Sequence, residues 1–173
     1  MAIDVLIDEA HIRQRVAELA GEIRRSFGPD VPVHFVSVLK GAFIFLADLV
    51  RAMEGPVTCD FIAVSSYAGM TSSGEVRLTK DLDQSLEGRD VVIVEDIVDT
   101  GLTLAYLQDI LRARRPRSLR TACLLSKPSR RKVDVPVEHI GFTIEDKFVV
   151  GYGLDVDEKY RNLPHIGVVK GGG

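Results

Sequence analysis

Residues 91–104 read VVIVEDIVDTGLTL. The first four residues are β-branched and apolar, which is typical of a parallel strand buried on both faces. The acids Glu95 and Asp96 follow directly, at the carboxyl end of the expected strand, where open α/β sheets bind their ligands. This stretch therefore predicts both the fold class and the position of a binding site.

A turn with the sequence Asp99-Thr100-Gly101 comes next, and its glycine lets backbone amides approach an anion closely. We expect Thr103 to cap a helix over residues 104–114, whose apolar side chains recur at helical spacing. The amino end of this helix would attract phosphate through its free N–H groups and its dipole. Acids beside an anion site indicate a sugar phosphate, because ribose hydroxyls donate to carboxylates while amides hold the phosphate.

Apolar runs alternate with amphipathic segments along the rest of the chain. Asp8 is the predicted N-cap of a first helix, which Gly28-Pro29 ends. A second helix is expected over residues 42–53, and the predicted strands cover residues 33–38, 57–64, 90–94 and 118–125. This order indicates an α/β fold whose parallel sheet has right-handed crossovers.

The composition narrows the class of protein less sharply than the motif does. A chain of 173 residues fits one domain, and 46% hydrophobic with 27% charged residues indicates a soluble globular protein. The formal charge of -3 gives no reason to expect nucleic acid, and two basic clusters, at residues 112–120 and 130–132, are interpreted as solvated faces or subunit contacts. The longest apolar region, residues 31–50, contains Lys40 and Asp48 and is not a membrane span. The start lacks the layout of a signal peptide, and Cys59 and Cys123 lie in apolar runs, so we expect reduced core cysteines in a cytoplasmic protein.

Residues 91–104 resemble the phosphoribosyl pyrophosphate motif of type I phosphoribosyltransferases. The flanking sequences narrow the resemblance to the bacterial hypoxanthine-guanine phosphoribosyltransferases, from VSVLKG at residue 36 to Lys170. The resemblance implies a single domain over residues 1–173, with a central, mainly parallel sheet flanked by helices and a small hood formed by the N- and C-terminal segments. It also implies purine salvage: Mg2+-dependent transfer of 5-phosphoribosyl from phosphoribosyl pyrophosphate to N9 of hypoxanthine or guanine, giving IMP or GMP and pyrophosphate.

The resemblance assigns roles to the residues of the motif. Glu95 and Asp96 would hold the ribose hydroxyls, either alone or together with direct binding of Mg2+. Asp155 would help to hold the Mg2+ bound to pyrophosphate. Asp99 would accept the N7 proton of the purine as a general base. The 5'-phosphate would lie on the turn formed by Asp99, Thr100, Gly101, Leu102 and Thr103.

Further segments carry implied roles. Leu39-Lys40-Gly41 would line the pyrophosphate site, with a non-proline cis peptide and the Lys40 amide near the leaving group, and Arg161 would contact the same group. Residues 65–80 would form a loop that closes over the site, led by Ser65-Ser66-Tyr67. Lys127 would donate to O6 of the purine, Phe148 would stack on its ring, and the Val149 backbone would read positions 2 and 6. A homodimer or homotetramer is expected, without a nucleic-acid or membrane partner.

From the residues alone, purely structural roles stay open for several of these positions. Lys40 and Arg161 would be surface side chains, Phe148 a core residue and residues 65–80 an ordinary surface loop. A haloacid-dehalogenase phosphatase needs two aspartates separated by one residue, whereas Asp96 and Asp99 are separated by two. A dinucleotide-binding turn needs G-x-G-x-x-G early in a βαβ unit, which the chain lacks.

Two alternatives lie within the same fold. Some proteins with this fold regulate pyrimidine operons by binding RNA, although they would not be expected to keep Lys127 together with FVVGYGLD and Tyr160-Arg161. The second alternative is a xanthine-preferring enzyme, since Lys127 would donate to O6 of any 6-oxopurine. Val156 stands where relatives often have an aromatic residue.

Overall fold

A six-stranded sheet forms the centre of the computed structural model, which describes residues 2–66 and 76–170. The strands lie in the order β4-β3-β2-β5-β6-β7, and every neighbouring pair is parallel except β3 and β4. Their bounds are β2 Val33–Leu39, β3 Val57–Ser66, β4 Val76–Lys80, β5 Asp90–Val98, β6 Ser118–Ser126 and β7 His139–Thr143. The predicted α/β fold with a mainly parallel sheet is confirmed.

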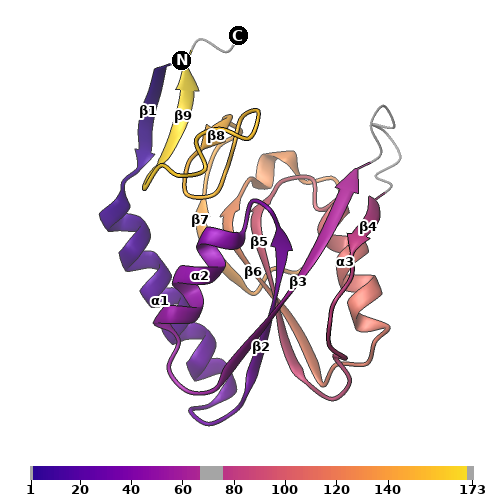
Figure 1. The fold of residues 1–173 in the computed structure, drawn as a ribbon. Coiled ribbons are helices and arrows are strands. Elements are labelled where there is room, and N and C mark those ends of the chain that lie inside the picture. The colour runs from indigo at the N-terminus through magenta and orange to yellow at the C-terminus, as the bar shows by residue number, and fades with distance from the viewer. Residues whose placement is uncertain (1, 67–75, 171–173) are drawn as a thin grey trace.

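Helices cover both faces of this sheet (Figure 1). The helices α1, Glu9–Phe27, and α2, Phe43–Ala52, pack on one face, and α3, Leu102–Arg112, packs on the other. Asp8 caps α1 as predicted, because its side chain accepts a hydrogen bond from the His11 amide at 2.8 Å. A 3-10 turn, Pro128–Arg130, follows β6. None of the helices within residues 2–66 and 76–170 is long and apolar enough to cross a membrane.

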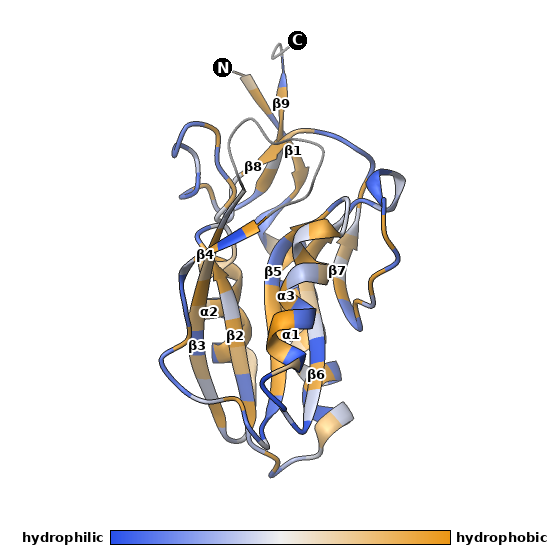
Figure 2. Ribbon diagram, turned by 90° about the vertical axis from the view of Figure 1, so that its right-hand side faces the viewer, coloured by the Kyte–Doolittle hydropathy of each residue, from blue (hydrophilic) through white to orange (hydrophobic). Residues whose placement is uncertain are grey.

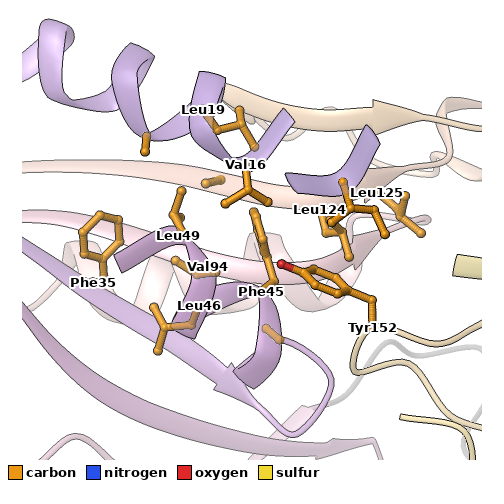
Figure 3. Packing of buried hydrophobic residues seen from close by; sticks show 14 of the residues in the cluster. Val16, Leu19, Phe35, Phe45, Leu46, Leu49, Val94, Leu124, Leu125 and Tyr152 are labelled. Atoms are coloured by element: carbon orange, nitrogen blue, oxygen red, sulfur yellow. The ribbon is translucent and has the colours of Figure 1, made fainter. Parts of the chain in front are cut away.

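The core has two layers because successive side chains of a strand point to opposite faces. In β5, Val92 and Val94 pack under α1 and α2, whereas Val91 and Ile93 pack under α3. Figure 3 shows the first layer, where Tyr152 reaches in beside Phe45 and Leu124. In Figure 2, β2, β3 and β5 are mostly orange, whereas much of the blue lies in the loops that connect the elements. The sheet is therefore a rigid platform for whatever lies at its strand ends.

Strand order reverses between β2 and β5. From β2 the chain passes through α2 to β3 on one side, and from β5 it passes through α3 to β6 on the other side. In open α/β sheets the crevice at such a switch point is the usual ligand site. The residues that follow β2 and those at the end of β5 are thereby brought together.

The two ends of the chain form a second, smaller sheet. Its strands are β1, Ala2–Ile7, β9, Ile166–Lys170, and β8, Val149–Val150, and all pairs are antiparallel. Figure 1 shows this sheet beyond the carboxyl ends of the central strands. The hood was expected from these same terminal segments, and its action as a cover stays a prediction.

Four expectations about the elements need correction. Strand β5 continues to Val98 instead of ending at residue 94, because it keeps pairing with β6 through its polar end. Helix α3 begins at Leu102 with Gly101 at its N-cap position, so Thr103 lies inside the helix and is not the cap. Cys59 is exposed rather than part of the core, because this part of β3 precedes the pairing with β4 and has a neighbouring strand on one side only.

The fourth concerns the expected loop over residues 65–80. Its two ends are strands, since β3 continues to Ser66 and Val76–Lys80 forms β4. Residues 67–75 lie outside the described part of the chain, as does the terminal Gly171-Gly172-Gly173. The expectation of a closing loop, with Tyr67 in it, therefore stays a prediction.

Candidate active site

The junction between β5 and α3 is a tight turn closed by its own side chains. The Asp99 carboxylate accepts a hydrogen bond from the Thr100 amide at 2.7 Å, and the Thr100 hydroxyl accepts one from the Leu102 amide at 3.3 Å. Gly101 has a φ of +86°, and an added Cβ would lie 3.0 Å from a methyl group of Val135. Glycine is therefore required here by both backbone conformation and space.

The segment after β6 holds this turn from behind. The Arg131 guanidinium donates to the carbonyl oxygens of Val98 at 2.9 Å and Asp99 at 2.8 Å, and to the hydroxyl of Ser126 at 2.8 Å. The Lys132 amide donates to the Thr100 carbonyl at 2.9 Å. Three consecutive carbonyls are thus engaged by groups of residues 131–132. Since carbonyl oxygens repel anions, fixing them in this way suits an anion site at the amino end of α3.

The acids at the end of β5 are held in an environment that disfavours their charge. Burial and the nearby carboxylates of Asp96 and Asp99 raise the pKa of Glu95 well above its ordinary value of 4.5. Burial also raises the pKa of Asp96, although the Ile97 amide, 2.6 Å from Asp96 Oδ1, opposes that shift. Because successive strand residues face opposite ways, Asp96 lines the pocket while Glu95 is buried beside it. Such a cluster favours ligands that bring hydroxyl donors or positive charge.

The turn after β2 lies directly against these acids. The Leu39-Lys40 peptide is cis, as the resemblance implied. An added Cβ on Gly41 would overlap the Asp96 carboxylate, and one on Gly153 would lie 2.5 Å from the Gly41 carbonyl oxygen. The ends of β2 and β5 and the segment after β8 therefore meet without side chains between them, and glycine makes that approach possible.

A pocket of about 470 Å³ opens at this meeting point. Among the predicted residues, its wall contains Asp96, Asp99, Lys127, Phe148, Val149 and Asp155, and it adds Ile97, Arg130, Asp146 and Leu154. Carboxylates lie toward β5, and a lysine and an aromatic ring lie toward β6 and β8. The pocket thus combines a polar half with a half suited to a planar ring.

The second half of the pocket is built around Lys127 and Phe148. Lys127 Nζ donates to the Lys147 carbonyl at 2.7 Å and lies 3.5 Å from an oxygen of Asp146, and its side chain is only 11% exposed. Phe148 is 59% exposed, although most aromatic residues are buried in cores. A fixed cationic donor beside an exposed ring is an arrangement that suits a heteroaromatic base with a carbonyl group.

A turn after the pocket gathers more charge. Arg161 Nη2 lies 3.4 Å from Asp155 and 3.1 Å from Glu158, and Glu158 also lies 3.2 Å from Lys40 Nζ. Positive φ angles at the non-glycine residues Tyr152, Asp157, Glu158 and Tyr160 occur in this region. Sparsely populated backbone conformations cluster at binding sites, which makes this turn part of the candidate site.

The predicted metal ligands do not form a ready-made cage. Across residues 2–66 and 76–170 no three carboxylate, imidazole or thiol groups converge closely enough to hold an ion. The carboxylates of Asp96 and Asp155 nevertheless line the same pocket, and oxygen ligands of this kind suit Mg2+, which usually keeps waters and substrate oxygens besides one or two carboxylates. The residues present therefore fit a magnesium ion that arrives with a phosphorylated substrate.

Four predicted residues contribute less to this geometry. Ser65 is exposed near the end of β3 and is not among the residues that line the pocket, and the strand ends at Ser66. Leu102 and Thr103 open α3 without lining the pocket wall.

Sequence reasoning missed four residues: Arg130, Arg131, Asp146 and Glu158. Arg131 and Glu158 act through partners far along the chain, Asp99 and Lys40, so no local pattern marks them. Asp146 carried a signal, because it lies two residues before Phe148, in a segment already assigned to the pocket.

Comparisons with known proteins agree on one family. Residues 5–157 match the family model described as a phosphoribosyl transferase domain. The chain is 50% identical to the hypoxanthine-guanine phosphoribosyltransferase of Bacillus subtilis, over 96% of this chain and 92% of the relative. It is 48% identical to the hypoxanthine phosphoribosyltransferase of Escherichia coli, over 96% and 95% of the two chains. A crystal structure of a hypoxanthine-guanine phosphoribosyltransferase from Bacillus anthracis is similar with a TM-score of 0.94 and 48% identity, over 97% of this chain and 99% of the other.

Proposed function

Because this chain belongs to the hypoxanthine phosphoribosyltransferases, the purine-salvage enzymes of the phosphoribosyltransferase family, we propose a specific division of labour in its pocket. The reaction is transfer of 5-phosphoribosyl from phosphoribosyl pyrophosphate to N9 of hypoxanthine or guanine, giving IMP or GMP and pyrophosphate. The observation that carries the proposal is the pocket itself, with Asp96 and Asp99 on one side and Lys127 and Phe148 on the other.

The sugar phosphate occupies the side formed by β5 and α3. The turn from Asp99 through Thr100, Gly101 and Leu102 to Thr103 holds the 5'-phosphate, supported by the amino end of α3. Glu95 and Asp96 serve the ribose hydroxyls, because carboxylates whose pKa is raised by burial and mutual repulsion gain from hydroxyl donors.

The base occupies the opposite side. Lys127 donates to O6, and its contacts with Asp146 and the Lys147 carbonyl fix the ammonium group at the wall of the pocket. Phe148 stacks on the purine with its exposed ring, while the Val149 backbone reads the edge at positions 2 and 6. Adenine presents an amino group to Lys127 in place of an acceptor, so we expect it to be rejected.

The pyrophosphate leaves on the side of Gly41 and Arg161. Lys40 and Gly41 approach it with backbone groups, and Arg161 supplies a guanidinium group. Asp155 would hold Mg2+ together with oxygens of the substrate, and the ion would supply positive charge beside the leaving group. Closure by the segment of Ser65, Ser66 and Tyr67 belongs to the same proposal and would exclude water.

Asp99 is the proposed catalytic residue. By analogy with glycoside hydrolysis, the transition state has oxocarbenium character, so electron density on the purine assists bond formation. Asp99 lines the pocket and can take the N7 proton of the base. This removes positive charge from the purine as N9 attacks the ribose.

The remaining properties follow from the same family. We place the enzyme in the cytoplasm, where Cys59 and Cys123 would stay as the free thiols observed. A nucleic-acid partner is not expected, because basic residues of the cluster are paired with acids, as in Arg114 with Asp81 and Arg117 with Asp90. A homodimer or homotetramer stays a prediction.

A spectrophotometric assay tests the proposal. The protein is given phosphoribosyl pyrophosphate, Mg2+ and one of hypoxanthine, guanine, xanthine or adenine, in parallel with the Asp99→Asn variant. We expect turnover with 6-oxopurines but not adenine, and a kcat about 10² to 10⁴ times lower for Asp99→Asn with a wild-type melting temperature. Normal turnover by the variant would exclude Asp99 as the base, turnover with xanthine above the others would favour a xanthine enzyme, and no turnover with any purine would reject the proposal.

A further inference from the structure

Glu158 lies between two cations from distant parts of the chain. Its Oε2 is 3.2 Å from Lys40 Nζ, and its Oε1 is 3.1 Å from Arg161 Nη2. Lys40 follows β2, whereas Arg161 precedes β9. One carboxylate thus engages each cation with a separate oxygen, and these two contacts lower the pKa of Glu158.

The turn that carries Glu158 fixes its direction. The Val156 amide donates to the Lys159 carbonyl at 3.1 Å, and the Lys159 amide donates back to Val156 at 3.0 Å. The two residues between them, Asp157 and Glu158, have φ angles of +52° and +66°, as a type I′ turn requires. The two backbone hydrogen bonds hold this turn in one conformation, which presents the Glu158 side chain to its partners.

Arg161 retains unused binding capacity. Its Nη1 donates to the Gly153 carbonyl at 2.7 Å, and its side chain is 18% exposed. Its buried Nε has no hydrogen-bond partner among the residues that the structure describes. The partly exposed Nη2 has only carboxylates as side-chain partners, so it can exchange them for the oxygens of an anion such as a phosphate.

We propose that Glu158 is an internal substitute for the pyrophosphate group, pairing with Lys40 and Arg161 in the free enzyme and releasing them when pyrophosphate binds. The proposal rests on the proposed function, in which Arg161 contacts pyrophosphate with its guanidinium group and Lys40 approaches it with its backbone. It adds that the Lys40 ammonium group, once it leaves Glu158, also contacts pyrophosphate. Binding must break both contacts of Glu158, and release restores them. Glu158 therefore lowers the affinity for pyrophosphate and for the pyrophosphate end of the substrate, and it favours departure of the product.

Replacement of Glu158 by Gln tests this directly, because Gln keeps the length of the side chain and removes its charge. We expect inorganic pyrophosphate, titrated with Mg2+ in a calorimeter, to bind about three- to tenfold more tightly, the range set by two exposed ion pairs. The KM for phosphoribosyl pyrophosphate should fall in parallel, with an unchanged KM for hypoxanthine. Unchanged or weaker binding of pyrophosphate would overturn the proposal.

Asp157→Asn is the matched control. Asp157 is the exposed neighbour of Glu158 in the same turn, and its carboxylate makes no ion pair within the described residues. The substitution changes net charge by the same amount, so we expect pyrophosphate affinity within about 1.5-fold of wild type, as for an unpaired surface charge in salt. Equal tightening in both variants would mean a general charge effect and would overturn the specific role of Glu158.

The Arg161→Gln variant separates this inference from the proposed function. It should weaken pyrophosphate binding, and adding Glu158→Gln to it should tighten binding less than in the wild-type background. Full additivity of the two substitutions would show that Glu158 does not act through Arg161, against the proposal. Unchanged pyrophosphate affinity in Arg161→Gln alone would instead reject the assignment of the pyrophosphate site, and the role of Glu158 with it.

Discussion

At the scale of single residues, Glu95 has a pKa raised by burial and by the charges of Asp96 and Asp99. The folded protein therefore keeps the Glu95 proton at pH values where the unfolded chain has lost it. As pH rises above the ordinary value of 4.5, the free energy of unfolding falls until the folded-state carboxyl also ionises. Without substrate, this carboxylate is a source of instability at neutral pH.

Glu95→Gln should remove that pH dependence. We expect urea denaturation between pH 5 and pH 8 to show a stability that declines less in the variant than in the wild type, with the raised pKa of Asp96 causing the decline that remains. The variant would be more stable by about 1 to 3 kcal/mol at the upper end. Parallel curves for the two proteins would show that the buried charge is already compensated. The KM for phosphoribosyl pyrophosphate should rise in the variant, because a ribose hydroxyl exchanges a carboxylate acceptor for the weaker, neutral amide oxygen.

Single residues of the site differ in whether the sequence could predict them. Asp96, Asp99 and Lys127 lie at the carboxyl ends of β5 and β6, so their position at one edge of the sheet could be predicted, and they do line one pocket. Phe148, which directly precedes β8, lines the same pocket but was assigned to it by the resemblance. Glu158 could not be found in this way, because its role depends on Lys40, which is 118 positions away. Motifs report local geometry, whereas partners that close a site from another segment leave no local pattern.

At the scale of elements, the junction of β5 and α3 depends on Arg131. Its three hydrogen bonds reach two successive carbonyls of the turn and the end of β6. Arg131→Met keeps most of the apolar stem of the side chain and removes every hydrogen-bond donor. We therefore expect the turn to loosen. The KM for phosphoribosyl pyrophosphate should rise about tenfold or more, because hydrogen bonds from a charged group are lost. The KM for hypoxanthine should change much less.

Steady-state kinetics with both substrates, together with thermal melting, would check this positioning role. Arg131→Lys supplies a single ammonium group in place of the fork and should restore only part of the affinity. A melting temperature that falls with both KM values rising together would indicate general damage to the fold instead.

The sequence predicted the presence of helices and strands better than it predicted their first and last residues. Apolar alternation and spacing identified β2, β3, β5 and β6 but neither β4 nor β7, and β5 extends four residues beyond the expected end at 94, to Val98. Pairing with β6 extends the strand through its polar residues, which local propensity does not reveal. Helix α3 starts at a glycine in the left-handed conformation, where a search for side-chain caps favoured Thr103.

At the scale of the whole molecule, the central sheet follows from the order of strands and helices, since parallel strands with right-handed crossovers leave few arrangements. The second sheet does not follow from any local pattern. It joins Ala2 to Lys170, a pairing set by contacts across the full length of the chain. Only the family resemblance led us to expect that the two termini would lie together.

Removal of residues 1–7 tests what this second sheet contributes. Strand β1 pairs with β9, and β9 in turn pairs with β8, which directly follows Phe148. Ile3 packs so closely on Gly167 that an added Cβ there would overlap it. Without β1, β9 loses one of its two neighbours, and the base side of the pocket loses its support.

We expect the truncated enzyme to keep the circular dichroism of the central sheet and its affinity for ribose 5-phosphate, because β5 and α3 belong to the other sheet. Its KM for hypoxanthine should rise by roughly tenfold, equivalent to about 1.4 kcal/mol of lost binding. Asp4→Asn is the matched control: it removes the exposed ion pair with Lys170 but leaves the strand, and such a pair contributes little. A truncated enzyme with the wild-type KM for hypoxanthine would show that β8 and β9 hold the base side of the pocket without β1.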